Sequence, residues 1–193
     1  MKFSKIKLTK AGTLECTYKN ADGDLVQFAG ANIVHKDLRE ALQALIPHLA
    51  IITEQREAHK KKLSDLRDQR ITDNEDNVYK RLSVSGVAFS ADGKKIIITG
   101  SRILSTAGVV SVCTPLTSLE EEEDYKYQND LALDVDAVIY EAKAYIEEKK
   151  WGVKQAELEF KDINPFDAIK TGEVPEAAPE GKPAKKGRKS KAA

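Results

Sequence analysis

The sequence lacks most of the features by which chemistry is recognised in a protein chain. It has two cysteines, one methionine and one tryptophan among 193 residues. Cys16 and Cys113 are far apart and neither belongs to a CxxC pair, which excludes the spacing of a zinc site and a disulfide framework. We expect both to be buried, reduced thiols, each inside a strand.

Catalytic and metal-binding motifs are missing as well. The chain has no glycine-rich phosphate loop after a strand and no GxSxG, and none of the three histidines, His35, His48 and His59, is four residues from another. The histidine spacing excludes the helical pair of zinc ligands, and we expect His48 to be a packed or surface residue. We therefore predict that the protein is not an enzyme and holds no metal and no cofactor.

Long apolar runs are also absent. No run approaches the roughly 18 apolar residues of a membrane span, and residues 1–5 lead into a strand without the apolar core of a signal peptide. We predict that the protein makes no membrane contact and stays in the cytoplasm where it is made.

Net charge is zero, with 31 basic and 31 acidic residues, but the charges are unevenly distributed. Residues 120–148 contain eleven acids and two lysines, whereas residues 182–191 contain six bases and no acid. Such segments can attract each other or bind separate partners. Because residues after 171 are mainly Pro, Ala, Glu and Lys, they cannot bury enough surface to offset chain entropy.

The remaining pattern predicts an α+β fold with hairpins and a meander of antiparallel strands, one long helix, a second shorter helix and a disordered tail. We place the globular domain at residues 1–161 and the linker and basic tail at 162–193. Alternating or β-branched runs predict strands, and Gly12, Asn20–Gly23 and Ser90–Gly93 predict the turns. The expected strands are 3–8, 14–19, 25–28, 78–89 with a bulge at Gly86, 96–104, 109–114 and 153–160.

The long helix is expected at residues 36–70. Asp37 and Glu40 fit a capping box, and Pro47 predicts a kink at 43–47. Apolar residues spaced alternately four and three positions apart form one buried stripe along the first half, and the same spacing continues into a basic second half. We expect one long helix, or two helices joined end to end, whose second half projects. Two interpretations of this second half remain, a coiled-coil arm and a solvated helix end. The stripe consists of Leu38, Leu42, Leu45, Leu49 and Ile52.

A second helix is expected to begin at Asp134 or Asp136, after a short strand that contains Leu131 and Leu133. Its apolar stripe ends near Trp151, with Gly152 as the carboxyl-terminal cap. The predicted stripe consists of Val135, Val138, Ile139, Ala142 and Ile146.

The two Ala-Asp-Gly turns are a candidate internal repeat. Residues 17–30 align without gaps with residues 87–100, and the alignment matches Ala21-Asp22-Gly23 with Ala91-Asp92-Gly93. The match reflects either a duplicated unit or the same turn chemistry chosen twice.

Nucleic acid is the partner that the charge pattern favours. Clusters of lysine and arginine neutralise phosphates without reading sequence, although a basic end can also serve solubility alone. Strand aromatics such as Tyr18, Phe28 and Phe89 could stack on bases or pack in the core. The predicted contact residues are Lys60, Lys61, Lys62, Lys182, Lys185, Lys186, Arg188, Lys189 and Lys191.

Local strings of this chain resemble small uncharacterised proteins encoded by bacteriophages of gut bacteria. They are ANIVHKDL at 31–38, YIEEKKWG at 145–152 and the Pro/Ala/Lys tail. The resemblance implies a small accessory protein in a bacterial cytoplasm and transfers no activity and no site residue.

Two functional hypotheses follow. The first is a non-enzymatic, nucleic-acid-associated accessory protein whose sheet or basic helix half contacts the phosphate backbone of DNA without strong sequence specificity. The second is a protein-interaction module without nucleic-acid binding, such as a homodimer, an inhibitor or an assembly factor.

Overall fold

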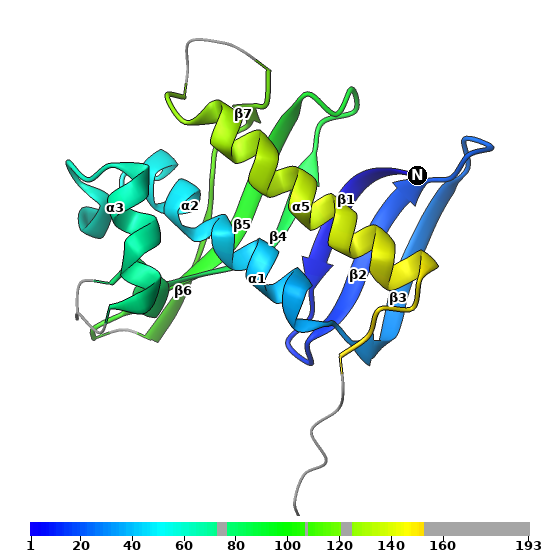
Figure 1. The fold of residues 1–193 in the computed structure, drawn as a ribbon, viewed down its shortest axis with the longest axis horizontal. Coiled ribbons are helices and arrows are strands. Elements are labelled where there is room, and N and C mark those ends of the chain that lie inside the picture. Colours follow the sequence, from blue (N-terminus) through cyan, green and yellow to red (C-terminus); the bar gives the residue numbers. More distant parts are fainter. Residues whose placement is uncertain (73–76, 107, 121–124, 153–193) are drawn as a thin grey trace, which may run out of the picture. The chain divides into compact units, whose positions relative to one another are not determined.

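The computed structural model describes residues 1–72, 77–106, 108–120 and 125–152 (Figure 1). The chain divides into two units, Met1–Lys154 and Gln155–Ala193, and every described residue belongs to the first. The strand predicted at 153–160 and the basic tail lie outside the described residues.

The first unit has the predicted α+β fold, and its sheet is antiparallel throughout. Six strands follow the order β3-β2-β1-β4-β5-β6, and the short β7 adds to one end of β5. The strands are β1 (Lys2–Leu8), β2 (Thr13–Lys19), β3 (Leu25–Ile33), β4 (Leu82–Phe89), β5 (Lys95–Leu104), β6 (Gly108–Cys113) and β7 (Thr117–Ser118).

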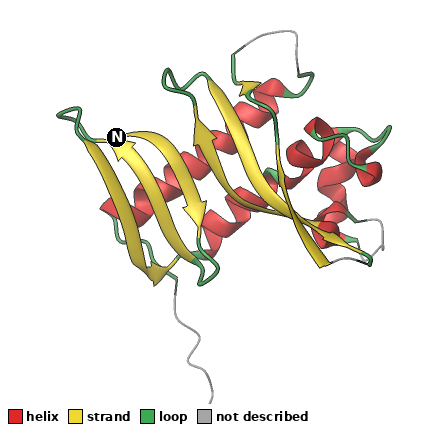
Figure 2. Ribbon diagram, turned by 180° about the vertical axis from the view of Figure 1, so that it is seen from behind, coloured by secondary structure: helices red, strands yellow, loops and turns green. Residues whose placement is uncertain are grey.

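Helices connect and follow the strands. The α-helices are α1 (Lys36–Ala44), α2 (Ile46–Ile52), α3 (Leu63–Asp68), α4 (Val78–Arg81) and α5 (Gln128–Glu147), and the 3₁₀ turns are η1 (Arg56–Ala58) and η2 (Gln69–Ile71). Helices α1 and α5 lie side by side across one face of the sheet (Figure 1). From behind, the strands stand in front of these helices (Figure 2), so none of the described helices covers the opposite face of the sheet.

The main core lies between the sheet and this helical layer. Strand alternation turns one set of side chains inward, where they meet the leucine stripe of α1 and α2 and the stripe of α5. Each fully buried leucine or isoleucine contributes about 1.5–3 kcal/mol relative to an exposed one. Fully buried members include Ile6, Leu14, Leu38, Leu42, Leu49, Ile98 and Leu131.

The two halves of the unit repeat the same arrangement around the β1–β4 pair. Ile6 pairs with Val87 at the centre of that junction, and both side chains are buried. Each half also has a serine at a register shift, Ser4 in β1 and Ser85 in β4. The Ser4 hydroxyl donates to the Thr17 carbonyl on β2, and the Ser85 hydroxyl donates to the Thr99 carbonyl on β5. Strands β1–β3 with α1 are thus matched by β4–β6 with α5.

This internal symmetry does not coincide with the two Ala-Asp-Gly turns. The turn at Gly23 joins β2 to β3, whereas the turn at Gly93 joins β4 to β5. The turn equivalent to Gly93 is the one at Gly12, between β1 and β2, where the glycine also has a positive φ. The matched turns therefore reflect shared turn chemistry at different places in the fold.

The helix predicted over residues 36–70 is interrupted, and its second half does not project. The expected break near Pro47 is present, since α1 ends at Ala44 and α2 begins at Ile46. Beyond α2, Glu54 and Lys60 adopt positive φ and the chain folds back. The reversal buries Leu63 and Leu66, the latter in a second cluster with Ile46 and Ala50, so a projecting coiled-coil arm is wrong.

Several element ends also differ from the prediction. The α1 N-cap is His35, whose ring accepts from the Asp37 amide, so Asp37 lies in the first turn instead of capping it. Helix α5 already begins at Gln128, so no strand contains Leu131, and it ends at Glu147 instead of near Trp151. A bulge is present in β4, but it lies at Ser85, one residue before the predicted Gly86.

Residues 78–81 form the helical turn α4 instead of the start of a strand. Cys16 is buried, and burial raises the pKa of its thiol to about 11, which leaves it unreactive. Cys113 is exposed, which corrects the expectation that both thiols are buried.

Candidate nucleic-acid interface

The face of the sheet without helices carries the alternate, outward side chains of its strands. Leu14, Cys16 and Tyr18 of β2 are buried under the helices, so the residues between them point to the opposite side. The same alternation holds in β5 and, on either side of their bulges, in β1 and β4. We call this surface the open sheet face. Its polar members are Lys5, Lys7, Glu15, Thr17, Lys19, Ser83, Lys95, Thr99 and Ser101, and Ile97 and Ile103 of β5 lie on the same side.

The open sheet face is basic and rich in hydroxyl groups. It has four lysines against one acid, Glu15, and the described residues form no ion pair with any of these lysines. Lys5 and Lys7 belong to the central strand β1 and stand opposite Ala88 and Gly86 of β4. Small residues on β4 leave the two ammonium groups uncovered, so they can reach a ligand that lies on the sheet.

Two open hollows mark this surface. One, of about 440 Å³, lies over β1–β3 and is lined by Lys5, Glu15, Thr17 and Gln27 among others. The other, of about 170 Å³, lies over the β1–β4 junction and is lined by Lys5, Lys7 and Thr99 among others. Because Lys5 borders both hollows, cationic and hydroxyl donors converge where an anion could be held.

The aromatic residues of the strands face away from this surface. Phe3 packs against Tyr18 with ring centroids 5.7 Å apart, Phe28 meets Tyr145 at 6.1 Å, and Phe89 packs against the core. Of the two uses predicted for strand aromatics, core packing is confirmed for Tyr18, Phe28 and Phe89. The described strands therefore offer phosphate contacts on the open sheet face and no stacking platform for bases.

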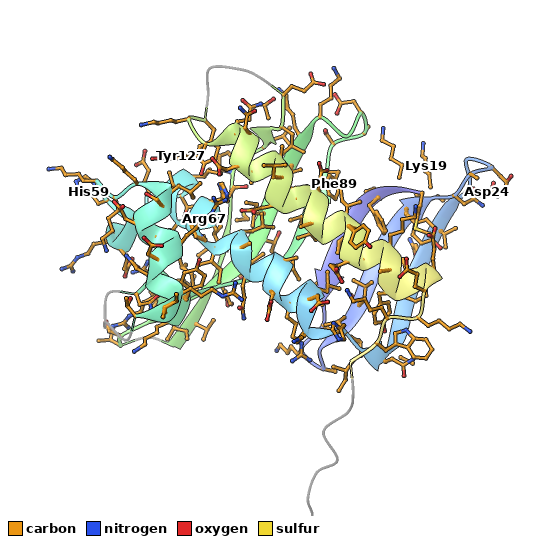
Figure 3. All side chains as sticks on the ribbon, in the orientation of Figure 1. Lys19, Asp24, His59, Arg67, Phe89 and Tyr127 are labelled. Atoms are coloured by element: carbon orange, nitrogen blue, oxygen red, sulfur yellow. The ribbon has the colours of Figure 1, made fainter. Side chains whose placement is uncertain are left out.

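The predicted lysines 60–62 form a second basic surface. They lie in an exposed loop between η1 and α3, and Arg56 and His59 are exposed beside them. Figure 3 shows His59 at the outer end of the helical region, pointing away from the sheet. We call residues 56 and 59–62 the basic loop. The structure brings its lysines together on a turn instead of along a helix.

A buried ion pair anchors the basic loop to the sheet. The Arg102 guanidinium on β5 donates to both carboxylate oxygens of Glu57 at 2.8 and 2.7 Å, and also to Gln55. The Glu57 side chain is only 8% exposed and that of Arg102 20%. These hydrogen bonds lower the pKa of Glu57 below its ordinary value.

Replacing Glu57 by glutamine should destabilise the protein by about 2 kcal/mol at pH 7, because the buried guanidinium loses its charged acceptor. A carboxylate with a lowered folded pKa stabilises the fold above its unfolded pKa, about 4.5, and this contribution is lost as pH falls through the folded pKa. The difference between wild type and variant should therefore shrink on going from pH 7 to pH 3. Urea unfolding at both pH values measures it. The exposed Glu54→Gln variant is the control, and a difference of equal size at both pH values would contradict the assignment.

A buried polar network joins the helices elsewhere in the unit. His48 is 0% exposed; its Nδ1 lies 2.8 Å from the Tyr125 hydroxyl and its Nε2 lies 3.1 Å from Asp134. Arg67 donates to Asp134 at 3.0 Å and to Asp130 at 2.9 Å, and Figure 3 shows it between α3 and α5. Both ring nitrogens of His48 are engaged and its ring is sealed from solvent, so the network connects α2, α3 and α5 rather than presenting a reactive group.

Sequence reasoning missed the lysines of β1 as candidate contact residues and missed the His48 network. The alternation of lysine with apolar residues at 3–8 carried the signal for the first. No local signal marked the second, because the partners of His48 lie 77 and 86 positions away. The predicted tail residues 182, 185, 186, 188, 189 and 191 lie outside the described residues.

Within the described ranges, no group of three or more His, Cys, Asp or Glu side chains is placed to hold a metal ion. No helix in these ranges is long and apolar enough to span a bilayer. Comparison with protein-family models, with curated proteins and with solved structures found no match for this chain.

Proposed function

We propose that the protein is a non-enzymatic accessory protein that binds nucleic acid through its phosphate backbone, without strong sequence specificity. The observation that carries this proposal is the open sheet face, where Lys5 and Lys7 stand uncovered beside the hydroxyls of Thr17 and Thr99. Ammonium and hydroxyl groups are the usual partners of phosphate oxygens. The resemblance to bacteriophage proteins suggests a host-cell cytoplasm as the setting.

The basic loop and the tail are proposed as additional electrostatic contacts. The loop presents Lys60, Lys61 and Lys62 on a turn anchored by Glu57 and Arg102. The tail adds six bases within residues 182–191. Contacts of this kind release counterions from the nucleic acid, so the affinity falls steeply as salt rises.

Charge reversal of Lys5 and Lys7 in the full chain tests the proposal. We expect the Lys5→Glu, Lys7→Glu variant to bind labelled DNA at least about tenfold more weakly near 0.1 M salt. The plot of log affinity against log salt should flatten by about 0.9 per lost phosphate contact on double strands and about 0.7 on single strands. Fluorescence anisotropy with both probes across a salt series measures affinity and slope together.

The matched control is Lys36→Glu with Lys126→Glu, which makes the same charge change on the helical layer. Equal losses in both variants would reduce the effect to net charge and contradict a defined surface. Glutamine substitution of lysines 60–62, and separately of the six tail bases, assigns the remaining affinity to loop or tail. An absence of binding by the wild-type chain at low salt would overturn the proposal.

A further inference from the structure

Among the described residues, none gives the edge strand β6 the protection that exposed sheet edges ordinarily carry. Five of its six residues are exposed. Its pairing with β5 runs without a register shift from Cys113, opposite Thr99, to Gly108, opposite Leu104. No described residue pairs with its outer side. Natural edge strands are blocked by lysines, prolines, bulges or covering segments, and β6 has neither a charged residue, a proline nor a bulge.

The opposite edge, β3, shows what protection looks like in this same sheet. The Gly152 amide donates to the Ile33 carbonyl at 2.8 Å, and the Tyr145 hydroxyl donates to the Asn32 carbonyl at 2.5 Å. Val34 also bridges to Trp151. The end of β3 is thus covered by the chain's own described residues, whereas β6 is not.

The stretch of sequence around β6 is uncharged in an otherwise highly charged chain. Residues 103–119 contain no Asp, Glu, Lys or Arg, although these make up 32% of the sequence. Of the ten exposed large hydrophobic residues in the described part of the chain, four come from this stretch: Ile103, Val109, Val110 and Leu116. Exposed apolar side chains gathered at an open edge mark an interaction surface.

We propose that β6 pairs antiparallel with β6 of a second copy of this chain, which joins the two sheets around a two-fold axis. An isologous contact requires a strand that is complementary to itself, and an uncharged strand meets its own copy without like-charge repulsion. Antiparallel pairing centred on Ser111 places Val110 opposite Val112 and Val109 opposite Cys113, each twice. This register covers the exposed valines on both faces and continues the open sheet face from one copy into the next.

The oligomeric state of the full chain, measured without nucleic acid, tests this inference independently of the proposed function. We expect the mass from light scattering or sedimentation to rise toward that of a dimer over about 1–100 μM, as suits an interface below the standard size. Val110→Lys should keep the chain monomeric over the same range, because it puts like charges on both sides of the axis. Its 43% exposure makes the variant compatible with the fold, which circular dichroism verifies.

Leu25→Lys is the matched control, because it makes the same change at an exposed residue of the other edge strand. Dissociation by Leu25→Lys alone would place the contact at β3 and overturn the inference. A wild-type chain that remains monomeric throughout the range would overturn it as well, and would leave the β6 edge to a strand from another protein.

Disulfide trapping tests the register. Cα atoms of directly opposed antiparallel residues lie about 4.5–5.5 Å apart, which a disulfide can bridge. Val109→Cys should therefore crosslink to the native Cys113 of the second copy under mild oxidation and give a dimer band on non-reducing gels. The band should disappear when Cys113→Ser is added, and its persistence would contradict pairing centred on Ser111.

Discussion

Replacing Gly86 by valine will separate β1 from β4 and destabilise the protein by about 3 kcal/mol or more, which is the upper range for overpacking. Gly86 directly follows the bulge of β4 and pairs with both Lys7 and Thr99. A Cβ atom at this position would lie 2.3 Å from the Ile6 carbonyl oxygen and 2.8 Å from the Lys7 Cα. Both obstacles are backbone atoms of β1, so the clash cannot be relieved by a rotamer change and the strand itself must move.

The effect is large because the β1–β4 pair is the junction between the two repeated halves. Its register contains only three residue pairs, centred on Ile6 and Val87. Urea unfolding followed by circular dichroism measures the free energy of unfolding. Ala88→Val on the same strand is the control: its side chain points to the open sheet face, and we expect a change within about 0.5 kcal/mol. A Gly86→Val chain as stable as wild type would show that β1 does not approach β4 so closely.

The strands could be predicted because their signals are local. Alternation fixes which residues of β2 are buried, and the turn at Gly23 needs a residue that tolerates positive φ. The order of the strands carries no local signal, since β1 pairs with β4 across the whole first half of the chain. The internal symmetry was equally hidden, because it rests on the strand order and on the equivalent bulges at Ser4 and Ser85.

The helices show how a periodic pattern can mislead. The apolar spacing continued beyond Ile52, yet the chain reverses because a straight helix would leave Leu63 and Leu66 in water. Helix α5 carried a readable stripe from Leu131 through Val135, but Asp134 resembled a cap. The Asp134 carboxylate instead binds residues distant in sequence: it accepts a hydrogen bond from Arg67 and lies beside His48.

The candidate site also has one part that local sequence signals reveal and one part that depends on long-range strand pairing. Lysines 60–62 were found because they are adjacent in sequence, and their exposure follows from the turn that holds them. Lys5 and Lys7 become a site only when β4 lies beside them with Gly86 and Ala88 in place of large side chains. A surface assembled from several strands depends on strand order, which composition and spacing do not encode.

Replacing His48 by alanine should destabilise the protein by about 3–4 kcal/mol, the range for removing a fully buried ring together with its hydrogen bonds. The ring is 0% exposed and fills space between α2 and the start of α5. Its loss leaves a cavity edged by Tyr125, whose ring centroid lies 5.7 Å from that of His48. It also leaves the Tyr125 hydroxyl without its hydrogen-bond partner 2.8 Å away.

Asp134 determines how much of this cost is electrostatic. Its carboxylate, 20% exposed, retains Arg67 at 3.0 Å after His48 is removed, so it does not become an unpaired charge. The larger part of the loss is therefore packing, and His48→Phe should recover part of the stability by refilling the cavity while the Tyr125 hydroxyl stays unpaired. Chemical denaturation of His48→Ala, His48→Phe and the exposed-loop control His59→Ala measures the three cases. We expect the control to change by less than about 0.5 kcal/mol. If His48→Ala were no less stable than His59→Ala, the ring could not be the buried connection between α2 and α5 that the structure shows.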